Sequence, residues 1–205
     1  MNDSLWNCLR YNKLEWLPEI GIGWFPVTAN PYDANYWNNY RRLDATFTGL
    51  QLTDMRMDMV TRHTKGAVVD IGIGGGRFVE NMAGARGFDV NPQAVAWLHE
   101  RGLWLDPYAA PVHAATFWDS LEHIHEPSAL FANIEQWAFI STPVYLDADD
   151  VMRSKHYKRE EHCWYFTVEG LRRFMFLGGF EMVEHNGMER EAGRDSIDSF
   201  AFKRF

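Results

Sequence analysis

The chain has 205 residues, of which 46% are hydrophobic and 23% are charged, and its formal net charge is −8. This length suits one domain with a substantial core, and the composition excludes a mainly disordered chain. The acidic balance argues against a surface built throughout to hold nucleic-acid backbones, although a local basic patch stays open. Two distant cysteines, Cys8 and Cys163, cannot form a disulfide framework or a four-cysteine zinc site.

The chain carries no sign of export or of a membrane segment. Its first thirty residues lack the basic-then-apolar order of a signal peptide. No apolar stretch approaches the roughly 20 residues that a membrane helix needs. We therefore expect a soluble cytoplasmic protein, monomeric or homodimeric, that does not contact membranes.

Residues 1–40 are rich in Trp, Tyr, Asn and Pro, and proline and glycine interrupt them repeatedly. They show no sustained helical or strand period, which predicts an irregular arm with short helical pieces. The pattern becomes helical from Pro31 to His63, and Thr53 has the residue type and position of an N-cap. We treat residues 1–62 as a flap over the remaining chain, not as an independent domain.

After Gly66, strand and helix patterns alternate. The expected strands are 67–71, 87–90, 102–105, 112–118, 137–141, 181–184 and 196–202, and the expected helices are 77–83, 92–101, 126–134 and 167–177. Pro92 suits the first position of its helix, and Thr167 suits an N-cap. This alternation predicts an α/β, Rossmann-like, doubly wound fold for residues 63–205. Its seven-stranded sheet is expected to be mostly parallel, with an antiparallel terminal strand and helices on both faces.

A glycine-rich turn follows the first of these strands, within residues 68–78. The dinucleotide pattern GxGxxG fails, because Arg77 or Val79 stands where its third glycine should be. The phosphate-binding Walker A pattern fails too, because no Gly-Lys-Ser/Thr follows. The pattern DxGxGxG fits, and it resembles motif I of the class I S-adenosylmethionine-dependent methyltransferases. In that family this loop surrounds the methionine part of the cofactor.

Two further motifs follow in the order of that family. Asp89 ends the second strand, where a carboxylate can accept hydrogen bonds from both ribose hydroxyls. Residues 116–127 resemble the segment after the fourth strand of small-molecule methyltransferases, including ubiquinone-pathway O-methyltransferases. The resemblance covers residues 66–142 and implies S-adenosylmethionine as the cofactor. The cofactor-binding residues that it implies are Asp70, Gly72, Gly74, Gly76, Asp89, Val90, Phe117, Trp118 and Asp119. Fewer residues than expected separate Asp70 from Asp89, which predicts a first helix about one turn short.

Methyl transfer requires a positioned acceptor and, in many cases, removal of a proton. His123, with Glu122 beside it, is the candidate catalytic residue near neutral pH. The alternative is that both residues only cap or pack at the start of a helix. Asp119, Glu122 and His123 are also similar to the metal-binding motif of some ubiquinone-pathway and small-RNA methyltransferases. Because relatives without metal share Leu-Glu-His, we assign no metal here.

Residues 144–166 form a charged insertion in which basic and aromatic residues alternate. This composition favours a lid over the acceptor, since long loops in compact domains are usually functional. The alternative is a solvated loop whose basic residues pair with nearby acids. We assign His156 and Trp164 of the insertion, and Tyr36 and Tyr40 of the arm, to substrate binding. Arg56 is a weaker candidate on the cofactor side.

The preferred function is therefore methyl transfer from S-adenosylmethionine to oxygen or nitrogen of a small or medium-sized molecule. DNA amino-methylation is disfavoured, because no Asp/Asn-Pro-Pro-aromatic tetrad ends the fourth strand. Methylation of RNA or of a modified nucleotide is the second hypothesis, supported only by the basic insertion. The third is an inactive cofactor-binding or interaction protein that keeps the same fold.

Overall fold

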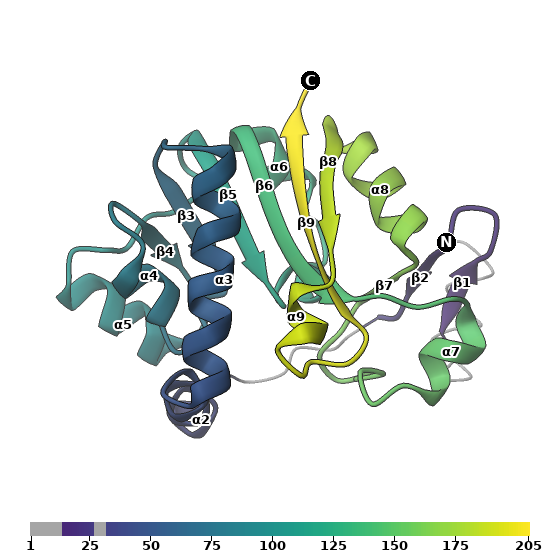
Figure 1. Cartoon of the computed structure of the whole chain (residues 1–205), viewed down its shortest axis with the longest axis horizontal. Coiled ribbons are helices and arrows are strands. Elements are labelled where there is room, and N and C mark those ends of the chain that lie inside the picture. Colours follow the sequence, from purple (N-terminus) through teal and green to yellow (C-terminus); the bar gives the residue numbers. More distant parts are fainter. Residues whose placement is uncertain (1–13, 27–31) are drawn as a thin grey trace.

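The computed structural model describes residues 14–26 and 32–205, which form two β-sheets with surrounding helices (Figure 1). The strands are β1 (Glu15–Leu17), β2 (Ile22–Trp24), β3 (Val68–Ile71), β4 (Arg86–Phe88), β5 (Val112–Trp118), β6 (Ile134–Pro143), β7 (Trp164–Phe166), β8 (Phe180–Asn186) and β9 (Ile197–Arg204). The helices are α2 (Ala34–Asp44), α3 (Phe47–His63), α4 (Arg77–Asn81), α5 (Pro92–Glu100), α6 (Ser128–Asn133), α7 (Ala148–Arg153), α8 (Val168–Leu177), α9 (Met188–Glu191) and a short 3₁₀ turn at Leu121–His123.

The main sheet confirms the predicted fold class. Its strand order is β4-β3-β5-β6-β9-β8; neighbouring strands from β4 to β6 run parallel, and β9 runs antiparallel to β6 and β8. The strand count is corrected from seven to six within the described residues. The expected strand at 102–105 is reduced to one parallel bridge between Gly87 and Trp104. Gly102 turns the chain with a φ of 63°, and Pro107 follows shortly, so the extended stretch is too short for a ladder.

Helices cover both faces of the main sheet. One face packs against α6 and α8 in a core that includes Phe117, Phe131 and Leu171. The other face packs against α3, α4 and α9 and includes Met59 and Trp118. Because successive residues of a strand point to opposite faces, the neighbours Phe117 and Trp118 belong to different cores. None of the described helices is both long enough and apolar enough to cross a bilayer.

The helix starts are partly as predicted. Pro92 begins α5, and the Thr167 hydroxyl caps α8 by accepting a hydrogen bond from the Gly170 amide. The prediction of Thr53 as an N-cap is wrong, because α3 begins after Thr46, whose hydroxyl accepts from the Gly49 amide. Thr53 lies inside α3, where its hydroxyl donates to a backbone carbonyl one turn earlier. The five-residue α4 confirms the short first helix.

The described part of the arm is more regular than predicted. β1 and β2 form an antiparallel pair, and β2 also pairs antiparallel with β7 at the end of the 144–166 insertion. A small core that includes Phe25, Tyr145 and Tyr165 stabilises this three-stranded sheet. In Figure 1 it lies beside the main sheet, next to α7. The arm and the insertion are thus joined, although more than a hundred residues separate them in the sequence. Residues 1–13 and 27–31 of the predicted arm lie outside the described residues.

Candidate active site

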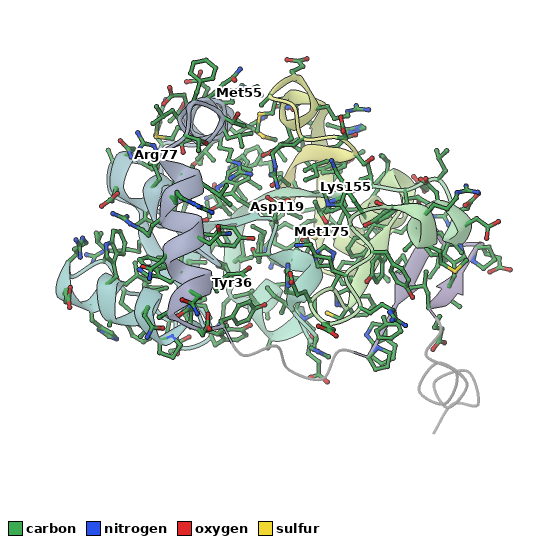
Figure 2. The ribbon with its side chains drawn as sticks, turned by 90° about the horizontal axis from the view of Figure 1, so that it is seen from below. Tyr36, Met55, Arg77, Asp119, Lys155 and Met175 are labelled. Atoms are coloured by element: carbon green, nitrogen blue, oxygen red, sulfur yellow. The ribbon has the colours of Figure 1, made fainter. Side chains whose placement is uncertain are left out.

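A pocket of about 240 Å³, the first pocket, lies at the edge where the parallel strands end. The carboxyl ends of such strands are the usual ligand-binding edge of a doubly wound sheet. Residues from all three sequence motifs line it: Gly72 and Gly74 after β3, Asp89 and Val90 after β4, and Trp118, Asp119 and His123 at or after the end of β5. Figure 2 looks onto this edge, with Asp119 near its centre, Tyr36 on α2 to one side and Lys155 of the insertion to the other.

The glycine loop requires glycine at specific positions. Gly72, Gly74 and Gly76 have φ values of 77°, 56° and 85°, which side-chain-bearing residues rarely adopt. Gly72 and Gly74 line the first pocket, whereas Gly76 does not. A Cβ on Gly76 would approach the Trp97 ring to 2.8 Å, so this glycine permits close packing of the loop on α5. The structure therefore does not bring Gly76, a predicted cofactor-binding residue, to either pocket.

The amino terminus of α4, directly after this loop, is already occupied by a carboxylate of the protein. The Arg77 amide donates to Asp44 at 3.3 Å, and Arg41 of α2 donates to the Gly75 carbonyl at 2.8 Å. A carboxylate there satisfies the positive end of the helix dipole that a pyrophosphate would otherwise use. The geometry therefore agrees with the failure of both phosphate-binding patterns.

Asp89 links the second motif to the first. One carboxylate oxygen accepts from the Ile73 amide at 2.9 Å, and the other accepts from the Asn91 amide at 2.8 Å. Burial raises the pKa of Asp89, and these backbone hydrogen bonds oppose that effect. Val90, next along the wall, is 67% exposed. Phe88 and Tyr108 extend the wall as an aromatic pair. This side of the pocket suits a flat, hydroxyl-bearing ligand such as a nucleoside.

The two aromatic residues at the end of β5 differ in their access to the pocket. Trp118 lines the first pocket, and the Arg56 guanidinium lies 5.1 Å from the centre of its ring. Phe117 is fully buried in the opposite core and lines neither pocket described here, so the structure does not bring it to the site.

Asp119 has an unusual backbone and unusual partners. Its φ is 57°, and one carboxylate oxygen accepts from Arg194 at 2.6 Å and from Arg56 at 3.3 Å. Burial alone would raise the pKa of Asp119, but the charges of Arg194 and Arg56 outweigh it and lower the pKa. The other oxygen, Oδ1, is buried and has no hydrogen-bond partner among the described residues.

A second pocket of about 420 Å³ adjoins the first and shares Tyr40, Gly72, Gly74, Trp118 and Asp119 with it. Arg56, Asp70 and Arg194 also line it. The Asp70 carboxyl is buried and accepts from the Thr116 hydroxyl at 2.7 Å. Burial raises the pKa of Asp70 to about 7. Together the two pockets offer a continuous wall from Asp89 to Arg194.

His123 lines the first pocket, and its Nδ1 lies 3.3 Å from the Tyr32 hydroxyl. Burial lowers the pKa of His123 to about 4. Glu122 is 1% exposed, lines neither pocket, and has no partner of normal hydrogen-bond geometry for its carboxylate. Burial and the charge of Asp119 raise the pKa of Glu122 to about 8.

His162 of the insertion completes a cluster with these two residues. One ligand atom from each of Glu122, His123 and His162 lies within 4.8 Å of the others. A carboxylate and two imidazoles are ligand types that divalent transition metals accept. The structure thus groups His162, and not Asp119, with Glu122 and His123. Asp119 instead contacts Arg56 and Arg194.

The predicted substrate residues divide into two groups. Tyr36 and Tyr40 line the first pocket and extend a row of rings that begins at Tyr32, with centroids 4.9 Å and 4.7 Å apart. His156 and Trp164 line neither pocket. A ring nitrogen of His156 contacts the Asp195 carbonyl at 3.0 Å, and the Trp164 indole donates to the Ile124 carbonyl at 2.8 Å.

Several site residues escaped the sequence analysis. They are Tyr32, Tyr108, Ser120, Ile124, His162 and Arg194. Tyr32 precedes the N-cap of α2 and so lies outside the helix that carries Tyr36 and Tyr40, although its ring contacts that of Tyr36. His162 and Arg194 carried no signal in the sequence, because they belong to irregular segments without a motif.

The comparisons with known proteins agree with this geometry. Residues 16–185 match a family model described as a methyltransferase domain. No curated protein sequence matches the chain. Among solved structures, the magnesium protoporphyrin IX methyltransferase of Synechocystis PCC 6803 with bound S-adenosylhomocysteine is similar, with a TM-score of 0.60 and 13% identity over 85% of this chain and 96% of that one.

Two further solved structures show the same likeness. A Thermotoga maritima protein titled a possible histamine N-methyltransferase has a TM-score of 0.60 and 13% identity, covering 83% of this chain and 97% of that one. The glycopeptide N-methyltransferase MtfA, complexed with S-adenosylmethionine, has a TM-score of 0.52 and 13% identity, covering 73% and 86%. At such low identity these likenesses show a shared fold. The family match covers most of the chain and confirms the resemblance found in the sequence: the chain belongs to the methyltransferase domain family.

Proposed function

We propose that the protein transfers a methyl group from S-adenosylmethionine to oxygen or nitrogen of a small or medium-sized acceptor. The observation that carries this proposal is the first pocket, where Gly72, Gly74, Asp89 and Asp119 from three separate motifs meet. The solved structures that share the fold include methyltransferases of small molecules with S-adenosylmethionine or its demethylated product bound.

The residues of the site fit the cofactor in three respects. Asp89 offers carboxylate oxygens for ribose hydroxyls, and Phe88 and Tyr108 offer aromatic surface beside it. Gly72 and Gly74 leave the backbone open to close approach. Asp119 Oδ1, a buried acceptor without a partner, suits an ammonium group. When bound, S-adenosylmethionine supplies an electrophilic methyl group on a sulfonium.

His123 is the proposed proton acceptor. It lines the first pocket, and its lowered pKa keeps the imidazole neutral and able to accept a proton at neutral pH. Glu122 touches neither pocket, so we assign it to supporting the turn that carries His123 rather than to the chemistry. The row of Tyr32, Tyr36 and Tyr40 excludes water from the same wall and favours an acceptor with apolar or aromatic surface.

The basic insertion, which supported the nucleic-acid hypothesis, offers less free charge than its sequence suggests. Lys155 pairs with Asp195 at 3.4 Å and Lys158 pairs with Glu161 at 3.2 Å. The same fold serves more than one reaction, since one similar structure is titled a [4+2]-cyclase, so the proposal rests on the residues of the site.

Calorimetry with S-adenosylhomocysteine tests the cofactor, and a screen with radiolabelled S-adenosylmethionine against quinols, phenols, amines, carboxylic acids and nucleosides tests the acceptor. We expect S-adenosylhomocysteine to bind with micromolar affinity, and we expect at least one small molecule of the screen to be methylated. Absence of any product binding would reject the cofactor assignment, and methylation of RNA alone would replace the acceptor class.

A further inference from the structure

The connection between β8 and β9, residues 187–196, contributes two charged side chains, Glu189 and Arg194, at or next to the second pocket. Glu189 is fully buried and lines neither pocket. One of its carboxylate oxygens pairs with Arg56 Nε of α3 at 2.7 Å, and the other pairs with Arg194 Nη1 at 2.6 Å. A single buried carboxylate therefore pairs with two guanidinium groups that lie far apart in the sequence.

Both arginines also reach Asp119, with Arg194 at 2.6 Å and Arg56 at 3.3 Å from the same oxygen. Asp119 and Ser196, which ends the β8–β9 connection, have φ values of 57° and 65°, and they are the only non-glycine residues of the described chain in the left-handed region. Such conformations persist where the surroundings fix them, and they concentrate at functional sites. Of these two positions, Asp119 lies at the pockets and contacts both arginines, and Ser196 follows Arg194 by two residues on the same connection.

Complementary hydrogen-bonding groups remain free beside each other. Asp119 Oδ1 is a buried acceptor without a partner. Nη1 of Arg56, and Nε and Nη2 of Arg194, donate to no group among the described residues. Arg56, Asp119 and Arg194 all line the second pocket. A free acceptor next to free guanidinium donors complements a zwitterion, whose ammonium and carboxylate are joined through one carbon.

We propose that Glu189 is a positioning residue that holds Arg56 and Arg194 so that they, with Asp119, bind the zwitterionic amino-acid end of S-adenosylmethionine. The inference rests on the proposed cofactor. Glu189 touches no ligand itself and acts through the two arginines. The β8–β9 connection, which no cofactor motif includes, then sets the preference for a donor that carries its amino-acid end over a truncated nucleoside.

Two ligands separate this role from general stability. S-adenosylhomocysteine carries the amino-acid end, and 5′-methylthioadenosine keeps the adenosine and the sulfur but lacks that end. Calorimetry compares both ligands on the wild type, Glu189→Gln and Arg194→Met. Arg190→Met is the matched control, since Arg190 lies on the same connection, is half exposed and pairs with Asp198 away from the pockets.

We expect Glu189→Gln and Arg194→Met to weaken S-adenosylhomocysteine binding about tenfold or more, because hydrogen bonds to charged groups are lost. Binding of 5′-methylthioadenosine should stay within about twofold, and the control should change neither ligand. Equal losses for both ligands, or an unchanged affinity for S-adenosylhomocysteine, would overturn the inference. A wild type that binds neither ligand would instead reject the proposed cofactor. If thermal denaturation shows that Glu189→Gln does not fold, Arg194→Met alone decides.

Discussion

The Asp89 carboxylate accepts a hydrogen bond of 2.9 Å from the Ile73 amide, so the acidic residue after β4 holds the glycine loop after β3. The same carboxylate accepts from the Asn91 amide and faces the first pocket. One side chain therefore shapes the loop and offers oxygens to a ligand, which makes it sensitive to substitution.

Asp89→Ala should weaken S-adenosylhomocysteine binding by about one to two orders of magnitude, because one or two hydrogen bonds to a charged group disappear. Isothermal calorimetry measures the loss. Asp58→Ala, which removes an exposed carboxylate from α3, is the control and should bind as the wild type does. Equal affinity in the two variants would show that Asp89 does not contact the ligand.

Two glycines with similar backbones form a matched pair for the stability of the loop. Gly76 and Gly84 have φ values of 85° and 77°, but a Cβ would meet the Trp97 ring only at Gly76. Gly84→Ala should cost about 1–2 kcal/mol of backbone strain. Gly76→Ala should cost about 1–3 kcal/mol more, because Trp97 must move. Urea denaturation compares the two, and equal losses would contradict the close packing.

His123→Ala should lower kcat about 10²–10⁴-fold for an acceptor whose proton must leave, while product binding changes little. The pKa of His123 is about 4 in the folded protein, so the imidazole is neutral above that value. The rate should therefore be flat with respect to His123 above about pH 5 and fall below it. A decrease in kcat between pH 7 and 6 that His123→Ala abolishes would contradict a buried base with a lowered pKa.

The raised pKa of Glu122 predicts that the free energy of unfolding falls as the pH rises. Its pKa is raised from 4.5 to about 8, so the folded state binds a proton that the unfolded state has already lost in this window. The contribution is therefore favourable below pH 4.5 and is lost as the pH rises through 8. Glu122→Gln should remove this dependence of stability on pH. At pH 8 it should raise the free energy of unfolding by about 1–3 kcal/mol.

Thermal and urea denaturation from pH 5 to 9, with a chelator present, measure this dependence. The chelator matters because a cation among Glu122, His123 and His162 would stabilise the ionised carboxylate. A wild type whose stability is unchanged or rises across this range would contradict a protonated Glu122.

The sequence was most informative about the site residues whose positions follow from the order of the parallel strands. The motifs that contain Asp70, Asp89 and Asp119 lie at the carboxyl ends of the neighbouring parallel strands β3, β4 and β5, and parallel topology places these ends at one edge of the sheet. Phe117 was predicted to bind the cofactor only because it stands next to Trp118 in the same motif, and it lines neither pocket. Alternation along β5 allows only one of two neighbours to face the pocket side, and that neighbour is Trp118.

Irregular segments were beyond prediction for a different reason. Arg194 and His162 reach the site from connections whose paths are set by long-range packing, such as the bonds of Asp195 to Lys155 and His156. Neither segment has a period or a turn signature that fixes its direction. Thr53 was misplaced because helix-capping residue types also occur inside helices, where the hydroxyl bonds to the preceding turn.

The pairing of β2 with β7 has a consequence for engineering. The segments beside the main sheet lie far apart in the chain, yet they share strand hydrogen bonds and a core of their own. Replacing the 144–166 insertion alone would leave β2 without a neighbour on one side and expose its backbone. A graft that aims to change acceptor choice should therefore exchange residues 14–26 together with the insertion, as one transferable unit.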